Sequence, residues 1–381
     1  MKVTGDWIEV EATQQVCRVF KRAGYQALFV GGCVRNALMD KPVRDIDIAT
    51  DAKPETVMKL MEAAGLKAIP TGIDHGTITV VADHIPHEVT TFREDVETFG
   101  RHAVVAYSTE ICQDARRRDF TMNALYAQPD GTVIDPLGGV DDLRARRVRF
   151  IEDPGQRIRE DYLRILRFFR FHAWYGDPDQ GLDSEGLAAV AAHLDGMQGL
   201  SRERVGGEVI KLLASPDPAP SVAAMRATGV LHCILPTADD RALGPLIHFE
   251  NLAGVAPDSI RRLAVLGGQE VPDRLRLSKD QARRLLQITA GVENMMSAAE
   301  LGYRCGVDLG RDILLARAAL LEQSVPLGMQ SDLEKGSAMQ FPITAQDLMP
   351  DYSGPSLGAR LKELEQRWIN SGFELTRDHL L

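Results

Sequence analysis

Two aspartates separated by one residue, Asp45 and Asp47, are the first candidates for chemistry in this 381-residue chain. They lie in RDIDIAT (44–50), where polar and apolar residues alternate as in a β-strand. Residues i and i+2 of a strand project from the same face about 7 Å apart, so both carboxylates point one way. Such a pair suits Mg²⁺, which often binds through one or two carboxylates together with substrate phosphates. An isolated Asp-x-Asp is more often a solvated strand edge.

A glycine pair precedes these aspartates. The segment ALFV (27–30) predicts a short buried strand, and Gly31-Gly32 then opens a helix that extends to about Met39. Backbone N–H groups at such a helix start, with the helix dipole behind them, favour an anion. Arg35, one turn into the helix, can add a charge-assisted hydrogen bond to a phosphate. The alternative is an ordinary strand-to-helix turn with an exposed arginine.

A third carboxylate, Glu88, lies in HEVTTF (87–92), which predicts another strand. Three acidic residues on adjacent strands can hold two metal ions about 3.5–4 Å apart. Taken alone, Glu88 would more often be a surface residue. Together with the glycine turn, the three carboxylates predict a site for a metal ion and a triphosphate.

The elements around these residues predict an α/β unit. Helices are expected over residues 7–23 and 54–64, with Pro54 in the first turn of the second. A strand over GTITVVAD (76–83) is expected to neighbour HEVTTF. Residues 93–112 have no clear period and predict a long connection. The result is a small mixed sheet with flanking helices.

From Pro154 to the C-terminus the spacing of apolar residues is helical, so the predicted fold class is an α+β head followed by an all-α remainder. The predicted domains are a head (1–146), a helical neck (147–214), a helical body (215–322) and a helical tail (323–381).

Composition and charge narrow the class of protein. The chain is 26% charged and 44% hydrophobic with a net charge of −10, which is typical of a soluble globular protein and argues against a generally basic nucleic-acid coat. Between Arg116 and Arg170, however, 12 arginines accompany 9 acidic residues, so this segment carries +3 and the rest −13. A local excess of arginine in an acidic protein indicates a confined anion site.

Other features point to a cytoplasmic protein without a membrane span. No apolar run approaches the roughly 20 residues that cross a bilayer, and MKVTGDWIEV lacks the core of a signal peptide. The five cysteines are odd in number and scattered, with no C-x-x-C pair, which indicates neither a disulfide framework nor structural zinc.

Motifs between residues 28 and 171 follow one another in a recognisable order. They read GGCVRNAL, RDIDIA, HEVTTFR, RRDFTMNAL, DPLGGVDDL and EDYLRILRF, and SRERVGGEV (201–209) follows them. In this order they resemble the class II tRNA nucleotidyltransferase and bacterial poly(A) polymerase family, which belongs to the DNA polymerase β nucleotidyltransferase superfamily. The resemblance implies a polymerase β-like head and, with far less specific sequence, a helical neck, body and tail. It also implies that the tail (323–381) contacts tRNA.

The resemblance also implies roles for the carboxylates. Asp45 and Asp47 would bind two Mg²⁺ ions that bridge the incoming triphosphate and the RNA 3′-hydroxyl, and Glu88 would help to organise that hydroxyl. In-line attack on the α-phosphorus then releases pyrophosphate.

Nucleotide-binding residues follow in the same way. Gly31, Gly32 and Arg35 would hold the triphosphate. Arg118 and Asp119 of RRDFTMNAL resemble the pair that contacts the nucleotide sugar and phosphates, and a carboxylate that accepts from a ribose hydroxyl would favour ribonucleotides. The alternative for Asp119 is an N-cap of the segment that follows it.

Asp161 and Arg164 of EDYLR are expected three apart on one helix, where they would present an acceptor beside a donor. Cytosine and adenine both show an exocyclic amine next to a ring-nitrogen acceptor, whereas guanine and uracil show the reverse order. Such a pair would accept C and A and leave G and U with unpaired polar groups. An i,i+3 salt bridge is the alternative.

Other residues are expected to support this pocket or to touch RNA. They are Asn123, Glu160, Arg167, Arg204, Glu208 and, within the long connection, Arg101. Gly138-Gly139 of DPLGGVDDL predict a turn or hinge between head and neck, or a plain loop.

The function implied is template-independent, Mg²⁺-dependent addition of CMP and AMP from CTP and ATP to tRNA that lacks a complete 3′ CCA end. Poly(A) addition, or addition of CC alone or A alone, uses the same chemistry and stays open. Two other classes fit less well: an RNA-binding module that has lost catalysis and a helical scaffold, neither of which needs clustered carboxylates near phosphate. No stable protein partner is indicated.

Overall fold

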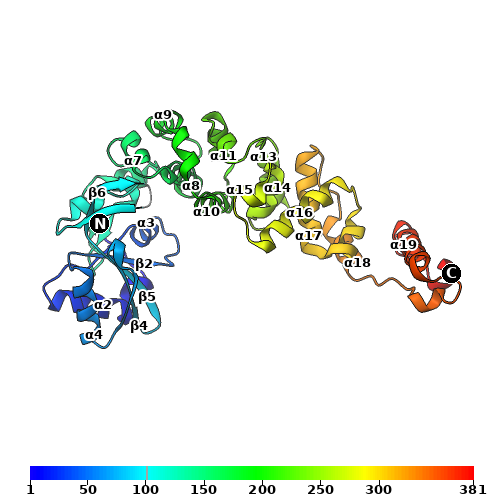
Figure 1. The fold of residues 1–381 in the computed structure, drawn as a ribbon, viewed down its shortest axis with the longest axis horizontal. Helices are drawn as coiled ribbons and strands as arrows, with labels where there is room; N and C mark the ends of the chain where they lie inside the picture. Colours follow the sequence, from blue (N-terminus) through cyan, green and yellow to red (C-terminus); the bar gives the residue numbers. More distant parts are fainter. Residues whose placement is uncertain (100–101) are drawn as a thin grey trace. The chain divides into compact units, whose positions relative to one another are not determined.

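The computed structural model describes residues 1–99 and 102–381 and divides the chain into two compact units, Met1–Ile234 and Leu235–Leu381 (Figure 1). The predicted head and neck fall within the first unit, together with the first helices of the predicted body. Domain boundaries inside each unit stay predictions.

A seven-stranded mixed sheet forms the centre of the first unit. In spatial order its strands are β3 (Lys67–Gly72), β4 (Thr77–Ala82), β5 (Ile85–Thr91), β2 (Ile46–Thr50), β1 (Leu28–Val30), β8 (Tyr126–Ala127) and β9 (Val133–Ile134). Neighbouring strands are antiparallel except β2 and β5, which are parallel. The sheet has more strands than the sequence predicted, because β8 and β9 are two residues each and β3 contains a proline.

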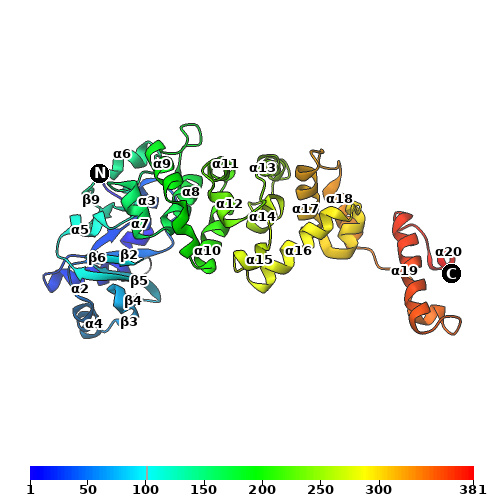
Figure 2. The same ribbon diagram turned by 45° about the horizontal axis from the view of Figure 1, so that its top comes forward.

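Helices cover the sheet and begin close to where the sequence places them. The helix expected over 7–23 is two helices, α1 (Asp6–Glu9) and α2 (Glu11–Arg22), because Val10 between them is extended at φ −58° and ψ 134°. α2 and α4 (Pro54–Ala63) pack against β3, β4 and β5 (Figure 2). α3 (Gly32–Leu38) contacts two other neighbouring strands of the sheet, β1 and β2.

The long connection predicted over 93–112 is wrong. Its described residues form an antiparallel pair, β6 (Arg93–Phe99) with β7 (His102–Tyr107), followed by α5 (Ile111–Arg116). The two strands form a sheet of their own. Cross-strand hydrogen bonds hold such a pair, and a search for periodicity in each strand alone does not detect them.

Short helices complete the first unit after the sheet. They are α6 (Gly139–Arg144), α7 (Pro154–Glu160), α8 (Leu163–Tyr175), α9 (Ser184–Ala192), α10 (Arg202–Leu213), α11 (Ala219–Ala227) and α12 (Val230–Ile234), with 3₁₀ turns η2 (Thr121–Asn123) and η3 (Leu194–Gly199). Phe120 contacts Phe150 at 5.0 Å and Phe171 of α8 at 5.1 Å between ring centroids. This aromatic contact anchors α8 to the segment that carries Asp119.

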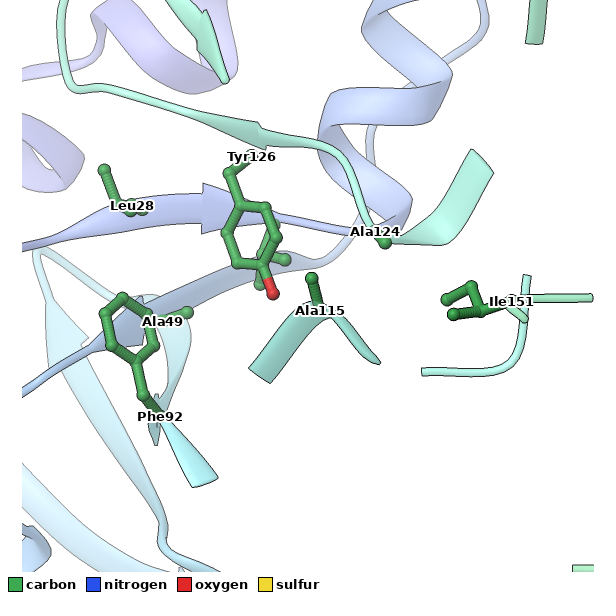
Figure 3. Packing of buried hydrophobic residues seen from close by; sticks show 8 residues of the cluster. Leu28, Ala49, Phe92, Ala115, Ala124, Tyr126 and Ile151 are labelled. Atoms are coloured by element: carbon green, nitrogen blue, oxygen red, sulfur yellow. The ribbon is translucent and has the colours of Figure 1, made fainter. Parts of the chain in front are cut away.

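An apolar core cluster lies where the sheet meets α5 and gathers Leu28, Val30, Ala49, Phe92, Ala115, Ala124, Tyr126 and Ile151 (Figure 3). Tyr126 is fully buried, and its hydroxyl points toward the helix of Ala115 (Figure 3). There it donates to Asp114 at 2.6 Å, so the polar end of the ring is satisfied inside the core.

The second unit is helical throughout, as the sequence predicted, and all of its residues are described. Its helices are α13 (Leu243–Leu252), α14 (Ser259–Leu266), α15 (Val271–Arg274), α16 (Lys279–Glu293), α17 (Ala298–Leu320), α18 (Met329–Ser337), α19 (Gly354–Asn370) and α20 (Arg377–Leu380), with the 3₁₀ turn η4 (Ala345–Leu348). α17 and α18 pack together, and Trp368 of α19 centres a separate apolar cluster. Within the part of the chain that the structure describes, no helix is long and apolar enough to cross a membrane.

Gly139 brings the DPLGG segment against the backbone near Asp119. A Cβ built on Gly139 would lie 2.2 Å from the carbonyl oxygen of Thr121, in a turn that immediately follows Asp119 and Phe120. Only a residue without a side chain permits this approach, so Gly139 sets how closely the DPLGG segment packs against the backbone of Thr121.

We expect Gly139→Ala to destabilise the protein by about 1–3 kcal/mol, because the backbone at Thr121 must move to admit a methyl group. Urea unfolding of the full chain measures the change. The matched control is Gly207→Ala, at an exposed helical glycine whose added Cβ would meet nothing within 4 Å. Equal stability of Gly139→Ala and this control would contradict the packing argument.

Candidate active site

The parallel pair β2–β5 places two carboxylates beside each other. In its register Asp47 lies opposite Glu88, and Asp45 directly precedes β2. Ile46 and Ile48, which alternate with the aspartates, are buried in the core. The predicted common face of Asp45 and Asp47 and their proximity to Glu88 therefore follow from strand alternation and pairing.

The charges in this group repel one another. Burial raises the pKa of Asp47 to about 6, and the neighbouring charges of Glu88 and Asp45 add to the effect, while Arg118 opposes it. A half-buried carboxylate beside two others is stabilised by a cation. Hard oxygen donors on one face fit a divalent ion that completes its coordination with phosphate oxygens and water. Among the described residues no group of three or more His, Cys, Asp or Glu side chains is arranged to enclose a metal by itself.

The glycine turn lies between β1 and α3 as predicted. Gly31 has φ 71°, a conformation that favours glycine, and it donates to the carbonyl of Leu125 at 3.0 Å. A Cβ on Gly31 would lie 3.4 Å from Nη1 of Arg118, so the turn and this arginine are close neighbours. Gly32 is the first residue of α3.

Arg35 is buried rather than exposed, with 6% of its surface accessible. Its guanidinium donates to Asn123 Oδ1 at 2.5 Å, to the Tyr175 hydroxyl at 2.8 Å and to Asn36 Oδ1 at 2.9 Å. The alternative of a solvated arginine on an ordinary turn is excluded. Burial lowers its pKa, which is the direction expected when a cation leaves water.

Asp119 lies at the centre of a chain of hydrogen bonds. Its Oδ1 accepts from Asn123 Nδ2 at 2.8 Å and from the N–H of Phe120 at 2.9 Å. Its Oδ2 accepts from Nε and Nη2 of Arg167 at 2.7 and 2.5 Å. The turn that follows is capped by Phe120 without a side-chain hydrogen bond, so Asp119 is not its N-cap. Together with Arg35, these bonds link α3, η2 and α8.

Arg118 does not bond to the adjacent Asp119 but contacts a different carboxylate, that of Asp114. It donates to Asp114 Oδ2 at 3.1 Å and to the hydroxyl of Tyr126 at 3.2 Å. Burial would raise the pKa of Asp114, but the charges of Arg118 and Arg117 outweigh it and hold that pKa well below the usual range. Arg118 is therefore held beside the glycine turn by a buried ionised carboxylate.

The prediction that Asp161 and Arg164 share one helix is wrong. α7 ends at Glu160 and α8 begins at Leu163, and Asp161 between them is extended at φ −153° and ψ 104°. The carboxylate accepts from the N–H of Leu163, which turns the chain into α8. A three-residue spacing in sequence does not ensure a continuous helix, since an aspartate can satisfy the backbone at a helix start.

Asp161 and Arg164 contact different partners. Asp161 Oδ2 accepts from Arg204 of α10 at 2.6 Å, while Arg164 donates to Glu160 at 2.6 Å and to two backbone carbonyls, those of Arg157 and Arg117. The i,i+3 salt bridge that was the alternative is thus not formed.

The residues predicted to support the pocket are brought together where the structure describes them. Glu160 pairs with Arg157 as well as Arg164, and Glu208 of α10 accepts from Arg170 of α8 at 2.5 Å. Asn123, Arg167 and Arg204 take part in the bonds given above. Arg101 lies outside the described residues, so the expectation for it stays a prediction.

A cavity of about 590 Å³ opens beside the carboxylates. Of the predicted residues, the cavity is lined by Gly32, Arg35, Asp45 and Asp47. It is not lined by Glu88, Arg118, Asp119, Asp161 or Arg164. Its further walls come from the segment after α3, the end of α8 and the end of α10; they include Lys41, Arg44, Arg170, Trp174, Tyr175 and Lys211.

Sequence patterns predicted few of the residues that form these walls of the cavity. Lys41 and Arg44 lie between the glycine turn and Asp45, so their position in the chain alone was a signal. Trp174, Tyr175 and Lys211 carried no such signal, because helix packing alone brings the ends of α8 and α10 to the cavity.

Two protein-family models match parts of this chain. The first match lies within the first unit, and the second extends a few residues past its end. The model of the poly A polymerase head domain matches residues 27–149, and that of a probable RNA and SrmB-binding site of polymerase A matches residues 181–241. The sheet, its carboxylates and the adjoining helices are those of a nucleotidyltransferase, and the protein is an enzyme of that class.

Relatives along nearly the whole chain specify the family. The mouse mitochondrial CCA tRNA nucleotidyltransferase 1 is 32% identical over 97% of this chain and 89% of its own length. The CCA-adding enzyme of Streptococcus gordonii is 32% identical over 94% of this chain and 92% of its own. The chain belongs to the family of CCA tRNA nucleotidyltransferases, or CCA-adding enzymes.

Solved structures agree on the fold. The CCA-adding enzyme of Bacillus stearothermophilus in complex with CTP has a TM-score of 0.72 at 25% identity, covering 95% of this chain and 93% of its own. That of Thermotoga maritima complexed with tRNA has a TM-score of 0.71 at 17% identity, covering 100% of this chain and 97% of its own, and supports the fold alone.

The bonds to Asp119 predict an effect of acid on stability. Burial raises its pKa, but the Arg167 charge and the hydrogen bonds from Asn123 and Arg167 outweigh burial and lower that pKa from 3.8 to about 2. A depressed pKa in the folded state stabilises the fold above the unfolded value and ceases to do so as the pH falls through the folded value. We expect Asp119→Asn to lower the free energy of unfolding at pH 7 by about 2 kcal/mol.

Urea unfolding of the full chain at a series of pH values measures this difference. It should narrow as the pH falls from about 4 to about 2, the interval between the unfolded and folded pKa values. Asp179→Asn, at an exposed aspartate of the same unit, is the matched control and should change little. A difference that stays constant over this interval would remove the ionised Asp119 from the stabilising network.

Proposed function

We propose that this enzyme adds CMP and AMP, taken from CTP and ATP, to the 3′ end of tRNA without a nucleic-acid template and releases pyrophosphate. The observation that carries the proposal is that Asp45, Asp47 and Arg35 line one cavity in a chain that belongs to the CCA-adding family. The reported relatives that span the chain are CCA-adding enzymes, so poly(A) addition is not favoured, although it uses the same chemistry.

The carboxylates supply the reaction centre. Asp45 and Asp47 would hold two divalent ions, which we expect to be Mg²⁺. When bound, such ions would stabilise the attacking and leaving oxygens at the α-phosphorus. Glu88, opposite Asp47 on β5, would accept a hydrogen bond from the RNA 3′-hydroxyl and orient it for attack.

The cationic side of the cavity would hold the triphosphate. Gly31 and Gly32 would bring backbone close to the phosphates at the start of α3. Arg35 would donate from the wall of the cavity, and Arg118, which does not line the cavity, from beside the glycine turn. Both guanidiniums are fixed by neighbouring side chains, so little rotamer entropy is lost when a phosphate binds.

The hydrogen bonds of Asp119 support a positioning part in addition to the nucleotide contact that the family resemblance implies. A carboxylate has about four acceptor positions, and four donors already occupy those of Asp119. A ribose hydroxyl would bind there only if Arg167 or Asn123 gave up its bond. We therefore assign Asp119 first to orienting Arg167 and Asn123, and through Asn123 to holding Arg35.

Asp161 and Arg164 would select the nucleobase. Arg204 and the N–H of Leu163 take one position on each oxygen of Asp161, which leaves acceptors for an exocyclic amine. Three bonds engage Nη1 and Nη2 of Arg164, which leaves two of its five N–H groups for a ring nitrogen. A base that presents a carbonyl to Asp161 and an N–H to Arg164 would leave all of these groups unpaired.

tRNA is the proposed partner of the helical part of the chain, and a cytoplasmic location stays a prediction. The match of residues 181–241 to a probable RNA-binding segment and the relatives that are CCA tRNA nucleotidyltransferases support an RNA partner.

The proposed activity predicts a defined product. Purified protein incubated with Mg²⁺ and tRNA lacking its 3′ end should incorporate C, C and then A when each labelled nucleotide is supplied in turn. Asp47→Asn should abolish incorporation, because it removes a carboxylate of the proposed metal site. The fold should stay intact, because burial and the charge of Glu88 already disfavour a negative charge on Asp47.

Incorporation is measured on gels and folding by urea unfolding. Asp74→Asn, at an exposed carboxylate outside the cavity, is the control and should remain active. A-only extension of unrelated RNA would instead support poly(A) addition. Full activity of the Asp47→Asn variant would remove Asp47 from the metal site.

The contact between Arg204 and Asp161 predicts a loss of base selection. Arg204→Ala leaves the Asp161 carboxylate without its charged partner, so we expect kcat/KM for CTP and ATP to fall about tenfold, while misincorporation of G and U rises. Asp161→Ala should relax selection further. Competition between labelled CTP and UTP measures the ratio.

Arg202→Ala is the matched control, since this arginine is exposed on the same helix two residues away. If Asp161→Ala and Arg204→Ala both leave selection of C and A over G and U unchanged, the base-selecting role of Asp161 is wrong.

A further inference from the structure

Two side chains that the reaction scheme does not yet explain, Lys41 and Tyr175, meet beside Arg35 at the end of α8. Lys41, from the segment after α3, and Tyr175, the last residue of α8, line the cavity together with Arg35. The Tyr175 ring centroid lies 4.0 Å from Cζ of Arg35 and 4.7 Å from Nζ of Lys41. One aromatic ring thus contacts two cations.

Neither cation is neutralised. Arg35 donates to the neutral oxygens of Asn36, Asn123 and Tyr175, and Lys41 donates to the carbonyl oxygen of Trp174 at 2.6 Å. Among the described residues no carboxylate forms an ion pair with Arg35 or Lys41. This differs from the other arginines near the site, such as Arg118, Arg164 and Arg167, which all pair with Asp or Glu.

The surroundings hold the two cations together at a cost. Burial lowers the pKa of Lys41, and the charges of Arg146 and Arg35 lower it further. The face of Tyr175 attracts both cations, and the carbonyl groups at the C-terminus of α8 attract Lys41. These contacts orient the two positive charges but do not neutralise them. A carboxylate would neutralise them. A dense anion in the cavity would cancel them.

The lining of the cavity has the same imbalance. Its described lining residues include the cations Arg35, Lys41, Arg44 and Lys211 and the carboxylates Asp45 and Asp47, together with Arg170, whose charge is paired with that of Glu208. The carboxylates belong to the reacting α-phosphate and its metal. The excess of positive charge on the other walls therefore fits the terminal phosphates of a nucleoside triphosphate.

We propose that Lys41 is a further binding residue for the terminal phosphates and that Tyr175 is a positioning residue that directs Lys41 and Arg35 toward them. The inference rests on the proposed function for the identity of the anion. Lys41 has two N–H groups left after its bond to Trp174, and these would donate to phosphate oxygens. Because the base does not enter this contact, CTP and ATP should depend on it equally.

Binding of inorganic tripolyphosphate to the full chain, measured by calorimetry without nucleotide or tRNA, tests the contact apart from catalysis. Lys41→Gln should weaken binding about tenfold or more, because it removes a charge-assisted hydrogen bond. Lys59→Gln, at an exposed lysine on α4 outside the cavity, is the matched control and should bind as the parent does.

Kinetics of nucleotide addition separate binding from general damage. Lys41→Gln should raise KM for CTP and ATP by similar factors with kcat and base selection nearly unchanged, and Lys41→Arg should restore much of the loss. Tyr175→Leu should weaken tripolyphosphate binding as well, whereas Tyr175→Phe, which keeps the ring and loses the hydroxyl, should lie between Tyr175→Leu and the parent.

Unchanged tripolyphosphate affinity in both Lys41→Gln and Tyr175→Leu overturns the inference, even if nucleotide addition is normal. If the parent binds tripolyphosphate through Lys41 but adds no nucleotide to tRNA, the proposed function fails and the anion contact stands. Lys41→Gln and Tyr175→Phe keep the test decisive if Tyr175→Leu does not fold.

Discussion

The ionised carboxylate of Asp119 is the interaction on which the arrangement of the site depends. It accepts from Arg167 on α8 and from Asn123 in η2, and Asn123 in turn accepts from Arg35 on α3. Three motifs far apart in sequence are thereby joined by short, mostly charge-assisted bonds. Asp119, Asn123 and Arg35 are buried, so removal of a partner from any of them would be costly, and the bonds fix one geometry. Phe120 packs on Phe171 of α8 beside them and excludes water.

Two kinds of electrostatic environment lie side by side around this network. Arg118, Arg164 and Arg167 are neutralised by the buried carboxylates of Asp114 and Asp119 and by the partly buried Glu160, and they act as fixed parts of the scaffold. The cavity itself is not neutralised: Asp47 faces Glu88 at one side, and Arg35 and Lys41 share the ring of Tyr175 at the other. Under the proposed function, a metal ion would relieve the first imbalance and a triphosphate the second, so the two ligands would complete one site.

Much of this site could be predicted because its chemistry is local in sequence. Strand alternation predicts that Asp45 and Asp47 share a face, and the Gly31-Gly32 turn predicts the start of α3; both are confirmed. The hairpin β6–β7 was missed because cross-strand pairing, not periodicity, forms it. Asp161 was wrongly placed on a helix because its side chain bonds to the N–H of Leu163 and breaks the helix there, a choice that spacing alone does not reveal.

The sequence by itself determined the class of fold, the family and the residues proposed to meet metal and phosphate, because strand alternation, glycine conformation and charge are properties of short segments. Only the tertiary structure decided which partners hold those residues. It turned Arg35 inward to Asn123 and Tyr175, filled the acceptors of Asp119, paired Asp161 with Arg204 and brought Lys41 to the end of α8. These contacts join residues up to 140 positions apart, so they depend on how helices and sheet pack rather than on any local pattern.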